Sequence, residues 1–300
     1  MYRLLGHRSS ASGRVHPRHI FLDLFGTLIY PTLPVHLRYN QVAQSNGFGD
    51  FNLSANHFKA AFKKTNREFP NYGKNSWLFS NSCSHETKVR MSPKDWWLKV
   101  IRATFENSLN PQEPNSALTR TRQIEEVSEL IYEAFLTNED GRIYSNYEDT
   151  SDFIKYLVRE EIDFSILTNS DPKIMNALPK GLEELLTWNV DEDAASGPSR
   201  RSKIFTSYDL GVTKPDKQVW ASVISMLGLS QANDRFIHIG DDFEEDFLGA
   251  KSAGLAAVWL DREDSLRRFS KTIENNAKGL HYQFMENERV SSLNELIGRL

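Results

Sequence analysis

The residue types best suited to chemistry occur in four short segments that lie far apart in the sequence. Asp23 ends an apolar run and precedes a glycine turn, Thr168 ends a second run, and Asp241 ends another. Lys214 stands directly before a proline. A carboxylate at the end of a parallel strand points into the crevice where α/β sheets bind ligands. Asp23 is therefore a candidate nucleophile, although such a residue alone is more often the cap of a turn.

The other three segments supply groups that complement a carboxylate of this kind. The Thr168 hydroxyl and the neighbouring backbone N–H groups offer donors for anionic oxygens. Lys214 offers a positive charge, although a lone lysine usually lies in solvent. The last segment concentrates carboxylates, which repel one another unless a cation such as Mg²⁺, which prefers oxygen ligands, lies between them. These residues are Asp241, Asp242, Glu244, Glu245 and Asp246.

Five short apolar runs alternate with helix-like stretches, which is the pattern of buried parallel strands connected by helices. The sequence thus predicts an α/β fold with a Rossmann-like parallel sheet flanked by helices, in which the strand ends meet at one edge. The predicted strands are residues 19–23, 164–168, 204–207, 236–241 and 256–260. The predicted helices are residues 152–159, 217–227 and 292–300.

The interval between the first two predicted strands is much longer than one crossover helix requires. Within residues 35–144, apolar side chains recur at spacings near three and four, as on one face of a helix. We expect an inserted all-helical cap domain there, with the Rossmann-like core formed by residues 19–34 and 145–300. Within the core, residues 182–203 are rich in Asp, Ser and Gly and predict a surface loop extension.

The bulk composition is that of a soluble globular chain, with 39% hydrophobic and 25% charged residues. The formal net charge is −4 and the acidic excess is spread along the chain, so we expect no nucleic acid partner. We expect no membrane partner either, because no apolar run reaches the roughly 18 residues that a spanning helix needs. The single cysteine, Cys83, excludes an internal disulfide and fits a reducing compartment. The composition makes no prediction of the oligomeric state.

Residues 1–18 form a separate basic segment. Four arginines are accompanied by serines, and no acidic residue precedes Asp23. This composition is typical of a mitochondrial transit peptide and equally of a flexible basic tail. We therefore expect an intracellular protein, either in mitochondria or else in the cytoplasm or nucleus.

Taken together, the four segments resemble the signature motifs of the haloacid dehalogenase (HAD) superfamily of hydrolases. Those motifs are a nucleophilic Asp followed by Gly-Thr, a Thr or Ser after the second strand, a Lys-Pro pair, and a Gly-Asp-Asp segment with a further Asp. Each motif alone is nonspecific, but their order and spacing are specific, and the resemblance covers residues 20–261. Residues 69–73 and 93–98 are similar to the cap of the subgroup called haloacid dehalogenase-like hydrolase domain-containing protein 3.

The resemblance implies a function for the polar residues at the strand ends. Asp23 would be the nucleophile in a phosphatase-type reaction on a small phosphorylated metabolite, with an aspartyl-phosphate as intermediate. Thr168 and Lys214 would be the other catalytic residues, holding the transferred group and neutralising its charge. Asn169 and Thr27 would contact the substrate.

The resemblance also implies a Mg²⁺ ion as the cofactor. Its protein ligands would be the side chains of Asp23 and Asp241 and the backbone carbonyl of Phe25. Asp242 and Asp246 would support the site by orienting metal-bound water or the lysine.

One position departs from the phosphatase pattern. Phosphatases of the superfamily have a second Asp two residues after the nucleophile, which acts as general acid and base, and this chain has Phe25 there. Because acid–base help is typically worth roughly 10²–10⁴-fold, hydrolysis is expected to be slow unless another group, such as Asp242 or His57, substitutes.

Two alternatives therefore stay open. A non-catalytic or regulatory binding protein that keeps the fold is supported by Phe25 and opposed by the retained polar residues. A metal-independent dehalogenase also has an aromatic residue at this position, because a halide leaving group needs no proton. However, the dehalogenases lack the acidic last motif and have a Tyr where this chain has Trp220.

Overall fold

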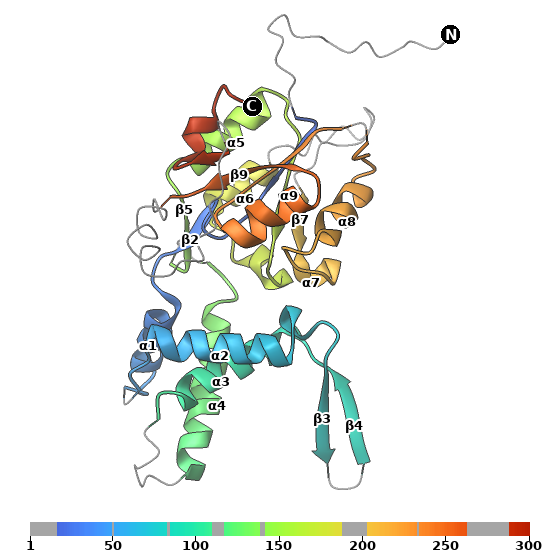
Figure 1. Ribbon diagram of the computed structural model, residues 1–300. Coiled ribbons are helices and arrows are strands. Elements are labelled where there is room, and N and C mark those ends of the chain that lie inside the picture. Colours follow the sequence, from blue (N-terminus) through green and yellow to red (C-terminus); the bar gives the residue numbers. More distant parts are fainter. Residues whose placement is uncertain are drawn as a thin grey trace, which may run out of the picture.

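The largest part of the fold is a six-stranded parallel sheet, of which Figure 1 labels the strands β7 and β9. Its strand order is β10-β9-β8-β1-β6-β7. The first strand of the chain lies inside the sheet, between β6 and β8. The strands are β1 His19–Leu22, β6 Phe164–Thr168, β7 Lys203–Thr206, β8 Phe236–Gly240, β9 Ala256–Leu260 and β10 Arg289–Val290. The computed structural model describes residues 17–49, 51–82, 85–109, 117–138, 142–187, 203–232, 234–262 and 288–300.

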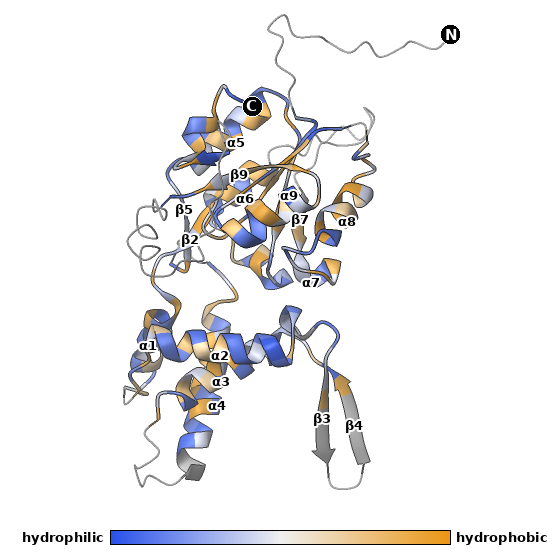
Figure 2. Cartoon of the chain, in the orientation of Figure 1, coloured by the Kyte–Doolittle hydropathy of each residue, from blue (hydrophilic) through white to orange (hydrophobic). Residues whose placement is uncertain are grey.

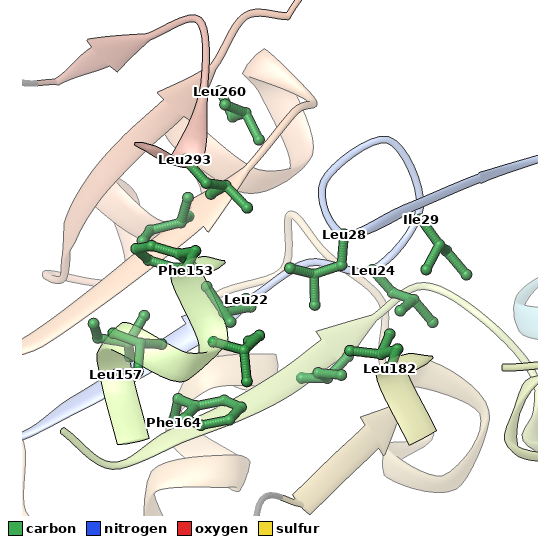
Figure 3. Close-up of a cluster of buried hydrophobic side chains, with 14 of the residues drawn as sticks. Leu22, Leu24, Leu28, Ile29, Phe153, Leu157, Phe164, Leu182, Leu260 and Leu293 are labelled. Carbon is green, nitrogen blue, oxygen red and sulfur yellow. The ribbon is translucent and has the colours of Figure 1, made fainter. Parts of the chain in front are cut away.

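Both faces of the sheet are covered by helices. Each strand contributes to both cores, because successive side chains of a strand point to opposite sides. Ile20 and Leu22 pack into one hydrophobic core, Phe21 packs into the other, and none of the three is exposed to solvent. Figure 3 shows the first core, where side chains from β1, α5 and α6 meet. Helices on that side are α5 Thr150–Arg159, α6 Lys180–Thr187 and the short 3₁₀ helix η5 Leu293–Leu296. Helices on the other side are α8 Gln218–Met226, the π-helical turn η4 Phe243–Leu248 and α9 Gly249–Ser252.

All five predicted strands are confirmed, and their ends differ from the prediction by at most one residue. The predicted helices at residues 152–159 and 217–227 correspond to α5 and α8. The predicted helix at residues 292–300 is wrong, because only the single turn η5 forms there. Ile297 has extended backbone angles and Gly298 has a φ of 78°, both of which end the helix.

The predicted loop extension at residues 182–203 is wrong at its start. Residues 182–187 lie in α6, where Leu182 is buried in the first core. It is also wrong at its end, because Lys203 begins β7. Residues 188–202, together with Cys83 and nearly all of the basic segment 1–18, lie outside the described residues.

Residues 35–144, which we call the helical segment, form a group of helices that lies beside the sheet (Figure 1). The N-termini of two of these helices carry capping boxes, formed by Ser54 with His57 and by Ser92 with Asp95. The helices are α1 Val35–Ser45, α2 Ala55–Glu68, α3 Pro93–Glu106 and α4 Ala117–Ala134.

The helical segment also contains a β-hairpin, so the expectation that it is all-helical is wrong. Strands β3 Trp77–Ser82 and β4 His85–Arg90 pair with Trp77 opposite Arg90, and Figure 1 shows the hairpin projecting away from the helices. The hairpin is too short to change the helical periodicity of the flanking sequence, which is why that periodicity did not reveal it.

The chain enters and leaves the helical segment through two strands that pair with each other. Strand β2, Ile29–Pro31, runs antiparallel to β5, Tyr144–Asn146. Figure 2 shows hydrophobic residues along the strands of the large sheet and mixed faces on the helices. Within the described ranges, no helix combines the length and apolarity needed to cross a bilayer.

Candidate active site

Three predicted site residues lie at the carboxyl ends of neighbouring strands. Asp23 follows β1, Thr168 ends β6 and Asp241 follows β8. The register is fixed by the parallel ladder, and the Asp23 N–H donates to the Ile239 carbonyl at 2.9 Å. Asp23 and Thr168 are buried, whereas Asp241 is partly buried. The sheet thus brings together residues that are more than 200 positions apart.

Lys214 reaches the same place from the loop before α8. Its ammonium Nζ lies 2.6 Å from Asp23 Oδ1 and 2.5 Å from Asp246 Oδ1, and the residue is only 3% exposed. Burial alone would lower the pKa of this amine, but the two carboxylates outweigh burial and raise the pKa of Lys214. The ammonium is therefore charged at any physiological pH.

Asp246 is held from three sides, which fixes its orientation. Its Oδ1 accepts from Lys214 and contacts His238 Nε2 at 2.9 Å, and its Oδ2 accepts from the Asp242 N–H at 3.0 Å. Trp220 Nε1 donates to His238 Nδ1 at 3.3 Å, so the histidine proton lies on Nε2 and points at the carboxylate. Although burial opposes it, the Lys214 ammonium and the histidine lower the pKa of Asp246.

A residue at position 240 other than glycine would disturb this arrangement. A Cβ on Gly240 would lie 2.3 Å from the Asp246 side chain, which is closer than any real contact. Glycine is thus required at the end of β8 because the carboxylate packs directly against the backbone.

Three carboxylates converge on one point at the strand ends. Asp23, Asp241 and Asp246 each offer an oxygen within 4.8 Å of the others. Burial and the neighbouring carboxylates raise the pKa of Asp23 and of Asp241 although the Lys214 charge opposes them, and the pKa of Asp241 rises to about 7. A divalent cation between Asp23 and Asp241 would offset this repulsion, and hard carboxylate oxygens are the donors that Mg²⁺ prefers.

The turn after β1 is shaped around Asp241. Gly26 has a φ of 80°, and a Cβ there would lie 2.1 Å from Asp241 Oδ2, so only glycine leaves room for the carboxylate. Thr27 donates its hydroxyl hydrogen to Asp241 Oδ1 at 3.3 Å. The structure thus pairs Thr27 with a candidate metal ligand, and its predicted contact with the substrate stays a prediction.

Arg262, which sequence reasoning did not identify, holds the turn after β1 by hydrogen bonds. Its guanidinium donates to the carbonyls of Gly26 and Thr27 at 3.2 and 2.7 Å, and to both Asp149 oxygens at 2.9 Å. Although burial opposes it, hydrogen bonds from the arginine and from Ser292 lower the pKa of Asp149. No pattern in the sequence indicates the Arg262–Asp149 pair, because these two residues and the turn that they hold lie in three distant segments.

The Asn169 side chain forms hydrogen bonds with both backbone groups of Lys214. Its Oδ1 accepts from the Lys214 N–H at 2.9 Å, and its Nδ2 donates to the Lys214 carbonyl at 3.0 Å and to Glu245 Oε2 at 2.7 Å. Both amide hydrogens of Asn169 are thereby used within the protein. A substrate contact through this amide stays a prediction, and any such contact would displace one of these partners. The sequence indicated Glu245 only as one of several acidic residues after β8 and suggested no individual role for it.

Phe25 occupies the position of the missing general acid. Its ring is partly buried and packs edge-on against Tyr144 with centroids 5.2 Å apart. The two residues suggested as substitutes have structural uses: Asp242 Oδ1 accepts from two N–H groups at the start of η4, and His57 completes the capping box of α2.

The helical segment contacts the strand ends through two aromatic side chains. Tyr72 donates its hydroxyl hydrogen to the Asn169 carbonyl at 2.8 Å, and Trp97 Nε1 donates to Asp171 Oδ2 at 2.6 Å. The ammonium of Lys173 lies 4.0 Å from the centre of the Trp97 ring. Trp97 is therefore an interface residue, whereas Trp96 is fully buried in the helical segment.

These features define an α/β protein of the Rossmann-like class, with a cluster of several carboxylates and one buried lysine at the strand ends. The chain belongs to the haloacid dehalogenase-like hydrolase family, whose model matches residues 17–254.

Similar proteins agree with this assignment. Haloacid dehalogenase-like hydrolase domain-containing protein 3 of Danio rerio is 24% identical over 96% of this chain and 98% of its own length. Phosphoserine phosphatase of Thermus thermophilus is 26% identical over 44% of this chain and 46% of its own length. The crystal structure of 2-haloacid dehalogenase from Pseudomonas syringae has a TM-score of 0.52 at 14% identity, covering 95% of this chain and 99% of that one. The last comparison shows a shared fold.

Proposed function

We propose that this protein is a Mg²⁺-dependent hydrolase that removes a phosphoryl group from a small phosphorylated metabolite, with Asp23 as nucleophile. The observation that supports this most strongly is the buried ammonium of Lys214, 2.6 Å from Asp23 and 2.5 Å from Asp246. A turn cap needs no buried cation beside it. A nucleophilic carboxylate does, because the lysine holds one of its oxygens and stabilises negative charge arriving at the other.

In the proposed first step, the free carboxylate oxygen of Asp23 attacks phosphorus while the bond from phosphorus to the leaving oxygen breaks. The product is an aspartyl-phosphate, and the leaving group departs with the electron pair of the broken bond. Water then attacks the aspartyl-phosphate, which releases inorganic phosphate and restores the carboxylate. Lys214 and the Thr168 hydroxyl would neutralise and orient the transferred oxygens in both steps.

The donors at the strand ends fit a Mg²⁺ ion. Asp23, Asp241 and the backbone carbonyl of Phe25 would hold it, and the ion would supply charge neutralisation at the phosphoryl oxygens. Asp246 is better suited to orientation than to ligation, because Lys214, His238 and a backbone N–H already occupy its oxygens. Titration calorimetry with Mg²⁺ alone would test this set, and Asp241→Asn is expected to weaken binding at least 10-fold.

The relatives favour phosphorylated substrates. A phosphatase is among the similar proteins, and a charged site of this type suits an anionic oxygen group better than an apolar one. A small metabolite is the proposed substrate, since the helical segment contacts the strand ends through Tyr72 and Trp97.

A second candidate function is that of a binding protein that has lost turnover. The observation that favours it is the Phe25 ring, which packs on Tyr144 where a general acid would be needed. Metal-independent dehalogenation is less well supported. Trp220 lies in the second hydrophobic core with its indole N–H given to His238, and the three converging carboxylates suit a cation.

Removing the nucleophile decides between turnover and binding. We expect Asp23→Asn to lower phosphate release from a panel of phosphomonoesters, measured with Mg²⁺ present, by about 10³-fold or more. The amide cannot attack phosphorus, although it still accepts a hydrogen bond from Lys214. Equal rates in the two proteins, with circular dichroism showing both folded, would reject the hydrolase proposal.

Restoring the acid tests whether the site is otherwise complete. We expect Phe25→Asp to raise turnover of alkyl phosphates by about 10²-fold, because a carboxylic acid there would protonate the leaving oxygen. Phe25→Leu is the matched control, since it removes the same ring without adding an acid. A similar gain in both variants would mean that ring removal, and not proton transfer, raises the rate.

A further inference from the structure

The backbone of Lys214 is held by one side chain, that of Asn169. One amide group binds both the N–H and the carbonyl of Lys214, at 2.9 and 3.0 Å. A bond on each side of the same residue fixes the point from which the lysine side chain starts. That side chain ends between the carboxylates of Asp23 and Asp246.

Asn169 is in turn held by two further groups. Glu245, from η4, accepts the remaining amide hydrogen at 2.7 Å. Tyr72, from the helical segment, donates its hydroxyl hydrogen to the backbone carbonyl of Asn169 at 2.8 Å. The first bond orients the side chain of Asn169, and the second holds its backbone. Only the second comes from the helical segment.

The chain adopts an unusual turn to deliver Tyr72. Asn71, Tyr72 and Gly73 have φ values of 49°, 55° and 74°, a region that residues with a Cβ rarely enter. The Asn71 side chain holds the turn against Ser207, the residue that follows β7. Its amide N–H donates to the Ser207 carbonyl at 2.8 Å, and its amide oxygen accepts from the Ser207 hydroxyl at 3.0 Å. Two consecutive non-glycine residues in this region indicate that surrounding contacts impose the conformation.

The Tyr72 ring is fixed on the opposite side by the helical segment. It packs on Trp96 and Trp97, with ring centroids 4.9 and 6.0 Å away. Burial, and after it the carboxylates of Asp171 and Glu245, raise the pKa of Tyr72. The phenol therefore stays protonated and remains a hydrogen-bond donor.

We propose that Tyr72 is a positioning residue of the candidate site. Its hydroxyl holds Asn169, and Asn169 fixes the backbone of Lys214. The lysine is then correctly placed only when the turn at residues 71–73 is seated on the sheet, so the helical segment controls the chemistry as well as the access of substrate.

The test removes the hydroxyl and keeps the ring, in the full chain. We expect Tyr72→Phe to lower kcat by about 3- to 10-fold, the value of one hydrogen bond, with KM changed less than twofold. Trp97→Phe is the matched control, because it removes another hydrogen bond between the helical segment and the strand ends, the one to Asp171, and keeps every hydrogen-bond partner of Asn169. It should raise KM and leave kcat unchanged. Loss of the same parameter to the same extent in both variants would overturn the proposal.

A spectroscopic measurement tests the same contacts without enzymatic activity. Only the measurement of kcat and KM rests on the proposed function. The backbone amide of Lys214 is followed by NMR in chain labelled with ¹⁵N-lysine and assigned by its loss in Lys214→Met. Its shift should change in Tyr72→Phe and not in Trp97→Phe. An unchanged shift in Tyr72→Phe would overturn the coupling, whereas failure of Asp23→Asn to lower activity would overturn only the hydrolase function.

Glu245 provides an independent variant of the same network. Glu245→Gln keeps an acceptor for the Asn169 amide, whereas Glu245→Ala removes it. We expect the Lys214 amide shift to be close to the native value in Glu245→Gln and displaced in Glu245→Ala. Equal displacement in both variants would show that charge, and not the hydrogen bond to Asn169, governs the lysine.

Discussion

At the scale of single residues, the candidate site depends on close packing of charged groups. The Lys214 ammonium is surrounded by carboxylates and is almost fully buried. A buried ion pair contributes little net stability, since desolvation offsets the attraction, but breaking one leaves an uncompensated charge. The arrangement is therefore better explained by function than by stability.

Gly26 offers a clean test of the proposed metal site. Gly26→Ala should weaken Mg²⁺ binding at least 10-fold, because the new Cβ would lie 2.1 Å from Asp241 Oδ2 and displace this ligand. It should also destabilise the fold by about 1–2 kcal/mol through its positive φ. Mg²⁺ titration calorimetry and urea unfolding measure the two effects.

Gly47 provides the control for backbone strain. Its φ of 82° matches that of Gly26, but no atom lies within 4 Å of a Cβ placed there. Gly47→Ala should show the same loss of stability with unchanged Mg²⁺ affinity. If both variants bind Mg²⁺ like the native chain, Asp241 is not a ligand.

At the scale of elements, strand ends are predictable from sequence because apolar runs stop where the chain leaves the sheet. For this reason Asp23, Thr168 and Asp241 lie at the strand ends where the sequence predicted them, and the parallel order of the strands requires their proximity. The partners of Asn169 and the Arg262–Asp149 pair were not predictable. They depend on side-chain direction across segments whose separation in sequence carries no periodic signal.

The hairpin β3–β4 shows a second limit of sequence reasoning. Its two strands have six residues each, which is too short for local spacing to favour strand over helix. Likewise, the apolar pattern at residues 292–300 predicted a helix, but Gly298 with a φ of 78° ends the turn early. A glycine in the sequence does not show by itself that a helix ends there, because the end depends on the backbone conformation of that glycine.

The element-scale prediction concerns the turn after β1. Arg262→Met removes hydrogen bonds to the carbonyls of Gly26 and Thr27 and leaves Asp149 without its cation. We expect a loss of about 1–3 kcal/mol in unfolding free energy together with weaker Mg²⁺ binding, because the turn positions Asp241. Both quantities can be measured on the purified chain.

Arg289→Met is the matched control for this turn. Arg289 pairs with Asp261, which is buried, at 2.6 Å and touches neither carbonyl of the turn. We expect lower stability with native Mg²⁺ affinity. A fall in affinity in both variants would attribute the effect to general loosening of the sheet.

At the scale of the whole molecule, the fold is expected to be sensitive to acid. His19, in β1, is 5% exposed with Nε2 at 2.9 Å from the Ser165 hydroxyl. Burial, and after it the Arg18 charge, lower the pKa of His19 from 6.5 to about 4. The unfolded chain therefore binds a proton at higher pH than the folded chain does.

The sign of this effect follows from proton linkage. As pH falls from about 6.5 to about 4, the unfolded state gains a proton that the native state does not, so the free energy of unfolding decreases, by about 3 kcal/mol over the window. Urea unfolding at pH 7.5 and 4.5 would measure the decrease. His19→Gln should flatten it, and an unchanged pH dependence in this variant would assign acid sensitivity to other groups.

The central place of β1 in the sheet has a consequence for synthesis of the chain. Its neighbours β6 and β8 begin at residues 164 and 236, so at about 5–20 residues per second a nascent β1 waits about 10 to 40 s for its second neighbour to leave the ribosome. During that time its apolar edge is open to association with other chains. A truncated product ending before residue 236 would keep this exposed edge permanently, and aggregation is its expected fate.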